Sequence, residues 1–280
     1  MKKLKIIYLR FRLILEDYFF TAPHFFYTPK FQINDKDISQ KLLQLKLNGY
    51  TSLGKIFDKK QVLAIKKCID NAVQSNKANS SKSLQYWTIH NPLKLHKLVF
   101  DTSMNLKCIS LAEKYFKRNV YLADIDIRRI MPAKMESIQA LGYSSSNWHR
   151  DTRGRQLKMM IYLSDVKKED SNFSFVPGTH LRSFARKMLF MESRLSNKEV
   201  KAIGIDPIEW TGEAGDAMLF DTNIIHRLRR KSKAAIRDSV TYYYTPGQNL
   251  RCLKYYKKNL HKNKTASRIF NEPFWPFKRD

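Results

Sequence analysis

Three residues of types that bind metal ions stand at a spacing that suits one shared site. His149 and Asp151 are two positions apart, and His226 follows about 75 positions later. In an extended segment, residues i and i+2 point to the same side, so His149 and Asp151 can face one ion. Two imidazoles and one carboxylate form the facial triad of non-haem Fe(II) oxygenases, which leaves part of the metal open. The sequence therefore predicts an iron site at these three residues.

Further motifs accompany the three ligands in a fixed order. The segment Tyr162–Val166 ends an expected strand with Leu-Ser-Asp, and Phe175–His180 contains Val-Pro-Gly-Thr-His. A Gly-Asp pair at Gly215–Asp216 begins the segment that runs into His226, and Arg237 stands eleven residues beyond that histidine. An His-x-Asp pair alone is common by chance, so the order of the whole set carries the inference.

In this order the motifs resemble those of the phytanoyl-CoA dioxygenase family of Fe(II)/2-oxoglutarate-dependent oxygenases. The resemblance covers roughly residues 119–246, about half of the chain. It implies a double-stranded β-helix, the cupin-like form of the jelly roll, with His149, Asp151 and His226 as the catalytic iron ligands. The implied cofactors are Fe(II), the cosubstrate 2-oxoglutarate and O2.

The resemblance also implies a 2-oxoglutarate site. Arg237 would pair with the distal carboxylate, because a planar guanidinium matches the two oxygens of a carboxylate. Many family members have Ser or Thr two residues after the distal histidine, where this chain has Leu228. Ser239 or Thr241 would supply the hydroxyl, since both alternate onto the face of Arg237. His180 is expected to cap or buttress the site without binding the metal.

The retained carboxylate of Asp151 favours hydroxylation over halogenation, because halide binding needs a vacant coordination position there. We therefore expect hydroxylation of an unactivated C–H bond in a small molecule or metabolite conjugate, with release of succinate and CO2; anionic, lipid-linked and sugar-linked compounds are the candidates. The substrate itself is not predicted. Candidate substrate contacts are Lys158, Tyr162, Arg129 and Trp87, for which a surface or core position is an equally good interpretation.

The elements that must position this site change character near residue 119. Residues 35–118 are expected to be mainly helical, with helices over Gln61–Val73 and Asp101–Phe116. Short β-like runs alternate with turns from there on. The expected strands are Val120–Ile130, Leu157–Leu163, Phe173–Val176, Ala217–Phe220 and Val240–Thr245. The fold class is therefore α+β with a mainly β core and flanking helices, and a parallel βαβ sheet is disfavoured.

This pattern divides the chain into three parts that we expect to form one structural domain. Residues 1–118 would pack as a helical part on a jelly-roll core at residues 119–247, which contains a helical insert at about 183–203. A basic and aromatic extension follows at residues 248–280.

The composition adds a strong positive charge. Lys and Arg total 52 against 25 Asp and Glu, a net charge of +27. This excess favours anionic partners such as phosphates, although a lysine-rich genome gives the same number without a functional cause. Two alternative functions follow: a 2-oxoglutarate oxygenase acting on nucleic acid through Arg227–Lys231 and Lys257–Lys258, or a basic membrane- or polyanion-binding module with a vestigial site. The phytanoyl-type motifs rank a small-molecule substrate first.

The cysteines and the N-terminus bear on location. The three cysteines, Cys68, Cys108 and Cys252, form no Cys-x-x-Cys pair and favour a reducing, cytoplasmic compartment. No apolar run reaches the roughly 18–20 residues that span a membrane. The basic, apolar stretch Met1–Leu15 is expected to be a terminal helix packed on the domain or, alternatively, an amphipathic helix on a membrane surface.

Overall fold

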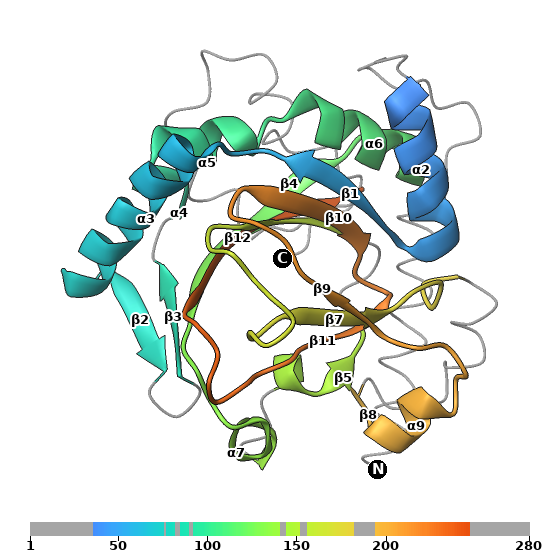
Figure 1. The fold of residues 1–280 in the computed structure, drawn as a ribbon. Helices are drawn as coiled ribbons and strands as arrows, with labels where there is room; N and C mark the ends of the chain where they lie inside the picture. The colour runs from blue at the N-terminus through green and yellow to red at the C-terminus, as the bar shows by residue number, and fades with distance from the viewer. Residues whose placement is uncertain are drawn as a thin grey trace, which may run out of the picture.

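The protein folds around two antiparallel sheets that face each other, with helices over one of them (Figure 1). The structure is a computed structural model that describes residues 36–75, 77–81, 85–89, 92–140, 144–151, 156–181 and 194–246. Every strand pair among these residues is antiparallel. The predicted jelly roll is confirmed, and the disfavoured parallel βαβ sheet is not formed by these strands.

The larger sheet has the strand order β1-β10-β6-β12-β4-β3-β2. Its strands are β1 (Tyr50–Lys55), β2 (Ala78–Ser81), β3 (Tyr86–Ile89), β4 (Tyr121–Ile130), β6 (Leu157–Tyr162), β10 (Asp216–Asp221) and β12 (Arg237–Thr245). The smaller sheet has the order β8-β5-β11-β7-β9. Its strands are β5 (Trp148–His149), β7 (Phe173–Val176), β8 (Arg194–Leu195), β9 (Ile208–Trp210) and β11 (Ile225–Leu228).

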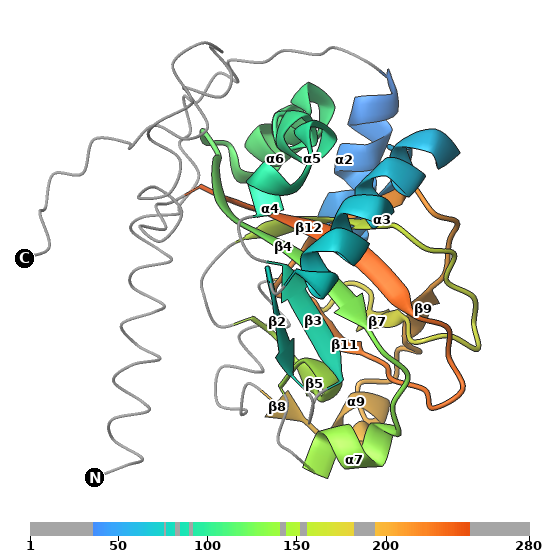
Figure 2. The same ribbon diagram turned by 90° about the vertical axis from the view of Figure 1, so that its left-hand side faces the viewer.

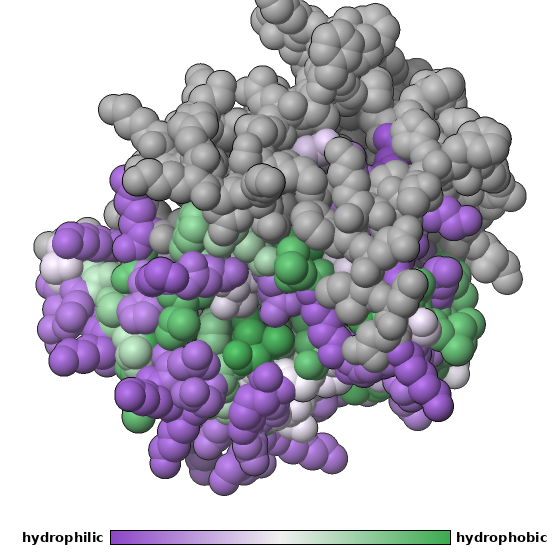
Figure 3. Space-filling model, turned by 90° about the horizontal axis from the view of Figure 1, so that it is seen from above, coloured by the Kyte–Doolittle hydropathy of each residue, from purple (hydrophilic) through white to green (hydrophobic). Residues whose placement is uncertain are grey.

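Helices from the N-terminal part cover the outer face of the larger sheet, whereas α7 and α9 lie at the opposite end, near β5 and β8 (Figure 2). The helices are α2 (Lys36–Asn48), α3 (Lys59–Gln74), α4 (Pro92–Leu95), α5 (Lys97–Thr102), α6 (Leu106–Phe116), α7 (Met135–Ala140) and α9 (Asn197–Lys201), with a 3-10 turn, η1 (Ser144–Ser146). Figure 3 views the molecule from above, from the side of the N-terminal helices. Hydrophobic side chains gather there between hydrophilic ones.

The helix predicted at Gln61–Val73 is confirmed as α3, which begins at a capping box between Asp58 and Gln61. The prediction of one helix over Asp101–Phe116 is wrong, because the chain forms α5 and then α6. The side chain of Asn105 accepts a hydrogen bond from the backbone N–H of Cys108 and starts the second helix as its N-cap.

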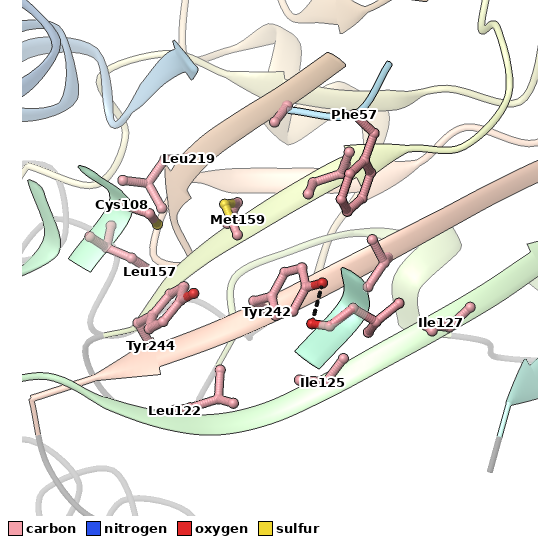
Figure 4. Packing of buried hydrophobic residues seen from close by; sticks show 14 of the residues in the cluster. Phe57, Cys108, Leu122, Ile125, Ile127, Leu157, Met159, Leu219, Tyr242 and Tyr244 are labelled. Carbon is pink, nitrogen blue, oxygen red and sulfur yellow. Dashed lines mark hydrogen bonds between the residues drawn. The ribbon is translucent and has the colours of Figure 1, made fainter. Parts of the chain in front are cut away.

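The main core lies between these helices and the larger sheet (Figure 4). Alternate residues of β12 point into it, so Tyr242 and Tyr244 are fully buried. Their hydroxyls donate to the backbone oxygens of Val99 and Ser103, each at 2.9 Å, which ties the sheet to α5 and the turn after it. The opposite face of β12 is thereby left to line the space between the sheets.

The N-terminal part also contributes strands that the sequence did not predict. β1 pairs with β10, and β3 joins β2 to β4, so residues before 119 complete the larger sheet. Within the predicted insert at 183–203, the described residues form β8 and α9, and the remainder lies outside the described residues. Met1–Leu15 and the 248–280 extension also lie outside them. No described helix is long and apolar enough to cross a bilayer.

The Gly-Asp motif forms the turn that joins three strands. Gly215 has φ of +98° and donates its N–H to the backbone oxygen of Tyr162 at 2.7 Å. Its own carbonyl accepts from Ile56 at 2.8 Å, just after β1. A Cβ at this position would lie 2.0 Å from the carbonyl oxygen of Phe57. Only glycine fits here, because both the backbone angle and the space exclude a side chain.

Replacing Gly215 with alanine should therefore lower the free energy of unfolding by about 2–5 kcal/mol, combining left-handed strain with overpacking. Gly204→Ala is the matched control, because its φ is +75° but nothing lies within 4 Å of the added Cβ. That control should cost only about 1–2 kcal/mol. Urea unfolding monitored by circular dichroism measures both values, and equal losses would show that the Phe57 contact does not matter.

Candidate active site

Strand pairing brings the three predicted metal ligands together. His149 on β5 lies directly opposite His226 on β11. Asp151 follows β5 and donates its backbone N–H to the carbonyl of Thr222 at 3.1 Å. One donor atom from each of the three side chains lies within 4.8 Å of the other two, so the trio could hold one metal ion.

Backbone carbonyls orient both imidazoles. Nδ1 of His149 lies 2.7 Å from the carbonyl oxygen of Asn147, and Nδ1 of His226 lies 2.8 Å from that of Ile224. A carbonyl can only accept, so each Nδ1 carries the proton and each Nε2 keeps a free lone pair. Those Nε2 atoms lie 3.7 and 3.9 Å from Oδ1 of Asp151. The lone pairs and one carboxylate oxygen therefore converge.

Lys158 on β6 forms an ion pair with the second carboxylate oxygen of Asp151. Its Nζ lies 2.5 Å from Oδ2, which leaves Oδ1 facing the two histidines. Burial acts to raise the pKa of Asp151, but the positive charge of Lys158 outweighs it and holds that pKa well below its usual range. Asp151 is therefore an anionic donor that offers one oxygen to a metal.

A pocket of about 540 Å³ opens onto the triad. The predicted cosubstrate residues Arg237, Ser239 and Thr241 all line it, as their alternation along β12 requires. Arg237 is buried, and its Nη1 donates to the carbonyl oxygen of Ser171 at 3.1 Å. Leu228 lines the same pocket from β11. A fixed guanidinium and two hydroxyls thus share one pocket with the metal ligands.

The family model described as phytanoyl-CoA dioxygenase (PhyH) matches residues 45–238. The chain belongs to the phytanoyl-CoA dioxygenase family. The family, the converging donor set and the jelly-roll fold together identify it as an Fe(II)/2-oxoglutarate-dependent oxygenase. The match begins at residue 45, inside α2, which is 74 residues before the start of the region of resemblance at residue 119.

Solved structures similar to this oxygenase share its fold. The epimerase SnoN from nogalamycin biosynthesis, in complex with Fe3+, α-ketoglutarate and nogalamycin RO, has a TM-score of 0.57 and 15% identity over 75% of this chain and 83% of its own. HygX from Streptomyces hygroscopicus, with nickel, 2-oxoglutarate and hygromycin B, has a TM-score of 0.53 and 13% identity over 75% and 87%. EctD from S. alaskensis, with 2-oxoglutarate and 5-hydroxyectoine, has a TM-score of 0.54 and 14% identity over 80% and 82%. A comparison with curated proteins finds no match.

The donor set fits Fe(II) in this oxygenase. Metal binding needs neutral imidazoles and an ionised carboxylate. Burial is the main cause that lowers the pKa of His149, and burial together with the neighbouring His149 lowers the pKa of His226 to about 3. His149, Asp151 and His226 would hold the iron, and Arg237 would hold 2-oxoglutarate. When bound, Fe(II) and 2-oxoglutarate would supply the electrons that activate O2.

The buried histidine also makes the metal-free protein sensitive to acid. His226 has a pKa of about 3 when folded but near 6.5 when unfolded, so only the unfolded chain gains a proton between these pH values. Stability present at neutral pH is therefore lost as the pH falls below 6.5, by about 1.4 kcal/mol per pH unit. Urea unfolding with chelator between pH 7.5 and 4.5 measures this slope. His226→Gln should flatten it, and an unchanged slope in that variant would contradict the assignment.

Two predicted substrate contacts, Arg129 and Trp87, are not brought to the pocket. Arg129 points to the helix side of β4, where it pairs with Asp238 at 2.9 Å and Asp70 at 2.6 Å. Trp87 lies opposite Arg129 in β3 and packs against the main core. The expectation that they lie near the pocket is wrong. Successive residues of a strand point to opposite faces, and both of these side chains lie on the face that the helices cover.

The sequence-based prediction did not include the residues of β4 and β3 that do line the pocket. Asp126 and Arg128 lie opposite Thr241 and Ser239 across the strand pair, and Tyr86 lies next to them on β3. A usable signal was present in the sequence. Buried Ile125 and Ile127 fix one face of β4, so the intervening residues must occupy the other.

The other two predicted contacts differ in role. Lys158 lines the pocket but is engaged by Asp151. Tyr162 is fully buried behind the pocket wall, where its hydroxyl donates to the carbonyl of Trp210 at 3.0 Å and its ring lies 5.6 Å from Cζ of Arg237. Burial raises the pKa of Tyr162 to about 12, so it is a neutral support for Arg237.

Thr179, and not His180, buttresses the metal strand. The Thr179 hydroxyl donates to the carbonyl of Val176 at 2.7 Å and accepts the N–H of Ile225 at 2.8 Å, directly before His226. The ring of His180 instead hydrogen-bonds to the carbonyl of Lys46 at 3.1 Å. The expectation for His180 is therefore corrected: it ties the Val-Pro-Gly-Thr-His turn to α2.

Proposed function

We propose that this oxygenase hydroxylates an unactivated C–H bond of a small molecule or metabolite conjugate. The observation that carries the proposal is Asp151, held as a third metal ligand by Lys158. A carboxylate at this place keeps a halide from the metal and favours return of oxygen to the substrate. The pocket volume of about 540 Å³ lies within the range typical of small-molecule sites.

The surroundings of the triad suit such a reaction. The rings of Phe173 and Phe220 lie 5.4 and 5.8 Å from the ring of His226 and give the pocket an apolar floor. An apolar floor excludes water from one side of the metal, while Arg237 orients the cosubstrate from β12. These residues bind and position reactants, and O2 activated by the bound iron and 2-oxoglutarate would carry out the oxidation.

Of the two basic segments behind the nucleic-acid alternative, Lys257–Lys258 lies outside the described residues, and cations of the run Arg227–Lys231 make contacts within the fold. Cζ of Arg227 lies 4.1 Å from the ring of Trp148, and Arg229 pairs with Glu209. Arg230 is buried and donates to the carbonyls of Gln85 and Met131. Contacts within the fold therefore engage these cations, which are not arranged to follow a phosphate backbone.

Untargeted metabolite profiling under 18O2 tests the reaction type. Similar structures are described as an epimerase and a carbocyclase, so the fold supports several outcomes. Hydroxylation predicts a product heavier by one 18O atom, formed by the wild type and not by Asp151→Ala. A product of unchanged mass, or one lighter by two hydrogens, would contradict hydroxylation while leaving the oxygenase class intact.

A further inference from the structure

The walls of the pocket carry an excess of positive charge that the iron site does not use. We propose that the substrate carries an oxyanion group, a phosphate or a carboxylate, and that Arg128 and Arg194 bind it. This inference rests on the proposed function, because it names the substrate class of the same pocket.

The charge balance of the pocket is the first support. Among the described residues its lining includes five cations and two carboxylates, an excess of three positive charges. The cations are Arg128, Arg150, Lys158, Arg194 and Arg237, and the carboxylates are Asp126 and Asp151. Fe(II) and doubly ionised 2-oxoglutarate cancel each other, so the excess persists in the loaded enzyme. A substrate with one or more negative charges would balance it.

Arg128 is the better prepared of the two groups. Its Nε lies 2.5 Å from Oδ2 of Asp126, and its Cζ lies 5.6 Å from the ring centroid of Tyr86. An ion pair within the same strand and an adjacent aromatic ring limit the rotation of the guanidinium. Its side chain is 34% exposed, so it remains accessible from the pocket. A pre-positioned guanidinium loses less entropy when it binds an oxyanion.

Arg194 approaches from the other sheet. It lies directly opposite His149 in the β5–β8 pair, so the two side chains project from the same face. Arg194 is exposed and lines the pocket beside the metal ligand. Arg128 on the larger sheet and Arg194 on the smaller sheet therefore face one space from opposite walls. A substrate anion between them would lie above the metal and fix which C–H bond meets it.

Titration of inorganic phosphate into the enzyme loaded with Ni(II) and 2-oxoglutarate tests this inference without turnover. Isothermal calorimetry should detect phosphate binding to the wild type, with Kd at least tenfold higher in Arg128→Met and in Arg194→Met. Lys60→Met is the charge-matched control, because Lys60 is exposed on α3 and does not line the pocket. Acetate in a parallel titration separates the sources: preference for phosphate indicates a phosphorylated substrate, and preference for acetate a carboxylate.

Three results would overturn the inference. The first is no binding of either anion to the loaded wild type. The second is an equal weakening by Lys60→Met, which would indicate a general charge effect. The third is loss of 2-oxoglutarate affinity in the Arg128 and Arg194 variants, which would assign both residues to the cosubstrate. Arg194 is exposed, so its variant keeps the test informative if Arg128→Met fails to fold. Anion binding without any oxygenated product would contradict the proposed function alone.

Discussion

Replacing Asp151 with alanine should abolish substrate-dependent succinate formation and lower the affinity for Fe(II) by roughly 100-fold or more. Losing a group that only supports a ligand costs about 10–100-fold in metal affinity or activity, so losing the ligand itself costs at least as much. Iron content after dialysis and succinate release with an active substrate measure the two effects.

The ion pair with Lys158 means that the Asp151 variant also loses stability, and a double variant at both positions is the control for that loss. Without the carboxylate, the Lys158 ammonium is left largely buried and unpaired, which costs up to about 3 kcal/mol of stability. The double variant Asp151→Ala with Lys158→Met removes both charges and should regain that stability. It should not regain iron or activity. Recovery of iron binding in the double variant would show that Asp151 is a structural partner and no ligand.

Replacing Arg237 with methionine should raise the apparent Kd for 2-oxoglutarate at least about 30-fold while leaving Fe(II) binding within about twofold of wild type. Removing one partner of a buried, hydrogen-bonded charge pair costs about 2 kcal/mol or more. Arg237 is buried against Tyr162 on β12, whereas the two histidine ligands come from β5 and β11, so the loss should fall on the cosubstrate. Titration of 2-oxoglutarate into the Ni(II)-loaded protein gives the Kd.

Arg237→Lys separates charge from geometry. Lysine keeps the positive charge but cannot bind a carboxylate through two parallel N–H groups, so its Kd should lie between those of wild type and Arg237→Met. Loss of iron in either variant, with 2-oxoglutarate affinity unchanged, would contradict the role given to Arg237.

The local part of the site could be predicted because strand alternation is a local property. His149 and Asp151 were paired by their spacing, and Arg237, Ser239 and Thr241 do share one face of β12. The same alternation holds in β4, where buried Ile125 and Ile127 mark the helix side. Arg129 shares that side, so Arg128 and not the predicted Arg129 faces the pocket.

Other features depend on contacts between distant parts of the chain. The segment Tyr50–Lys55 is short and mostly polar, and becomes a strand because it pairs with the edge of β10, while Gly215 accepts the N–H of Ile56 directly after it. The break between α5 and α6 depends on the Asn105 cap, which competes with a continuous apolar pattern. The ion pair between Lys158 and Asp151 joins neighbouring sheets and leaves no periodic signal in the sequence.

The most direct measurement is an anaerobic titration of 2-oxoglutarate into the Fe(II)-loaded protein, followed by visible absorption. A weak charge-transfer band should grow to saturation at one 2-oxoglutarate per iron, because the cosubstrate chelates the metal held by His149, Asp151 and His226. The band should be absent in His226→Ala and should require more 2-oxoglutarate in Arg237→Met. Binding of both Fe(II) and 2-oxoglutarate to the wild type with no such band would contradict an oxygenase site at these residues.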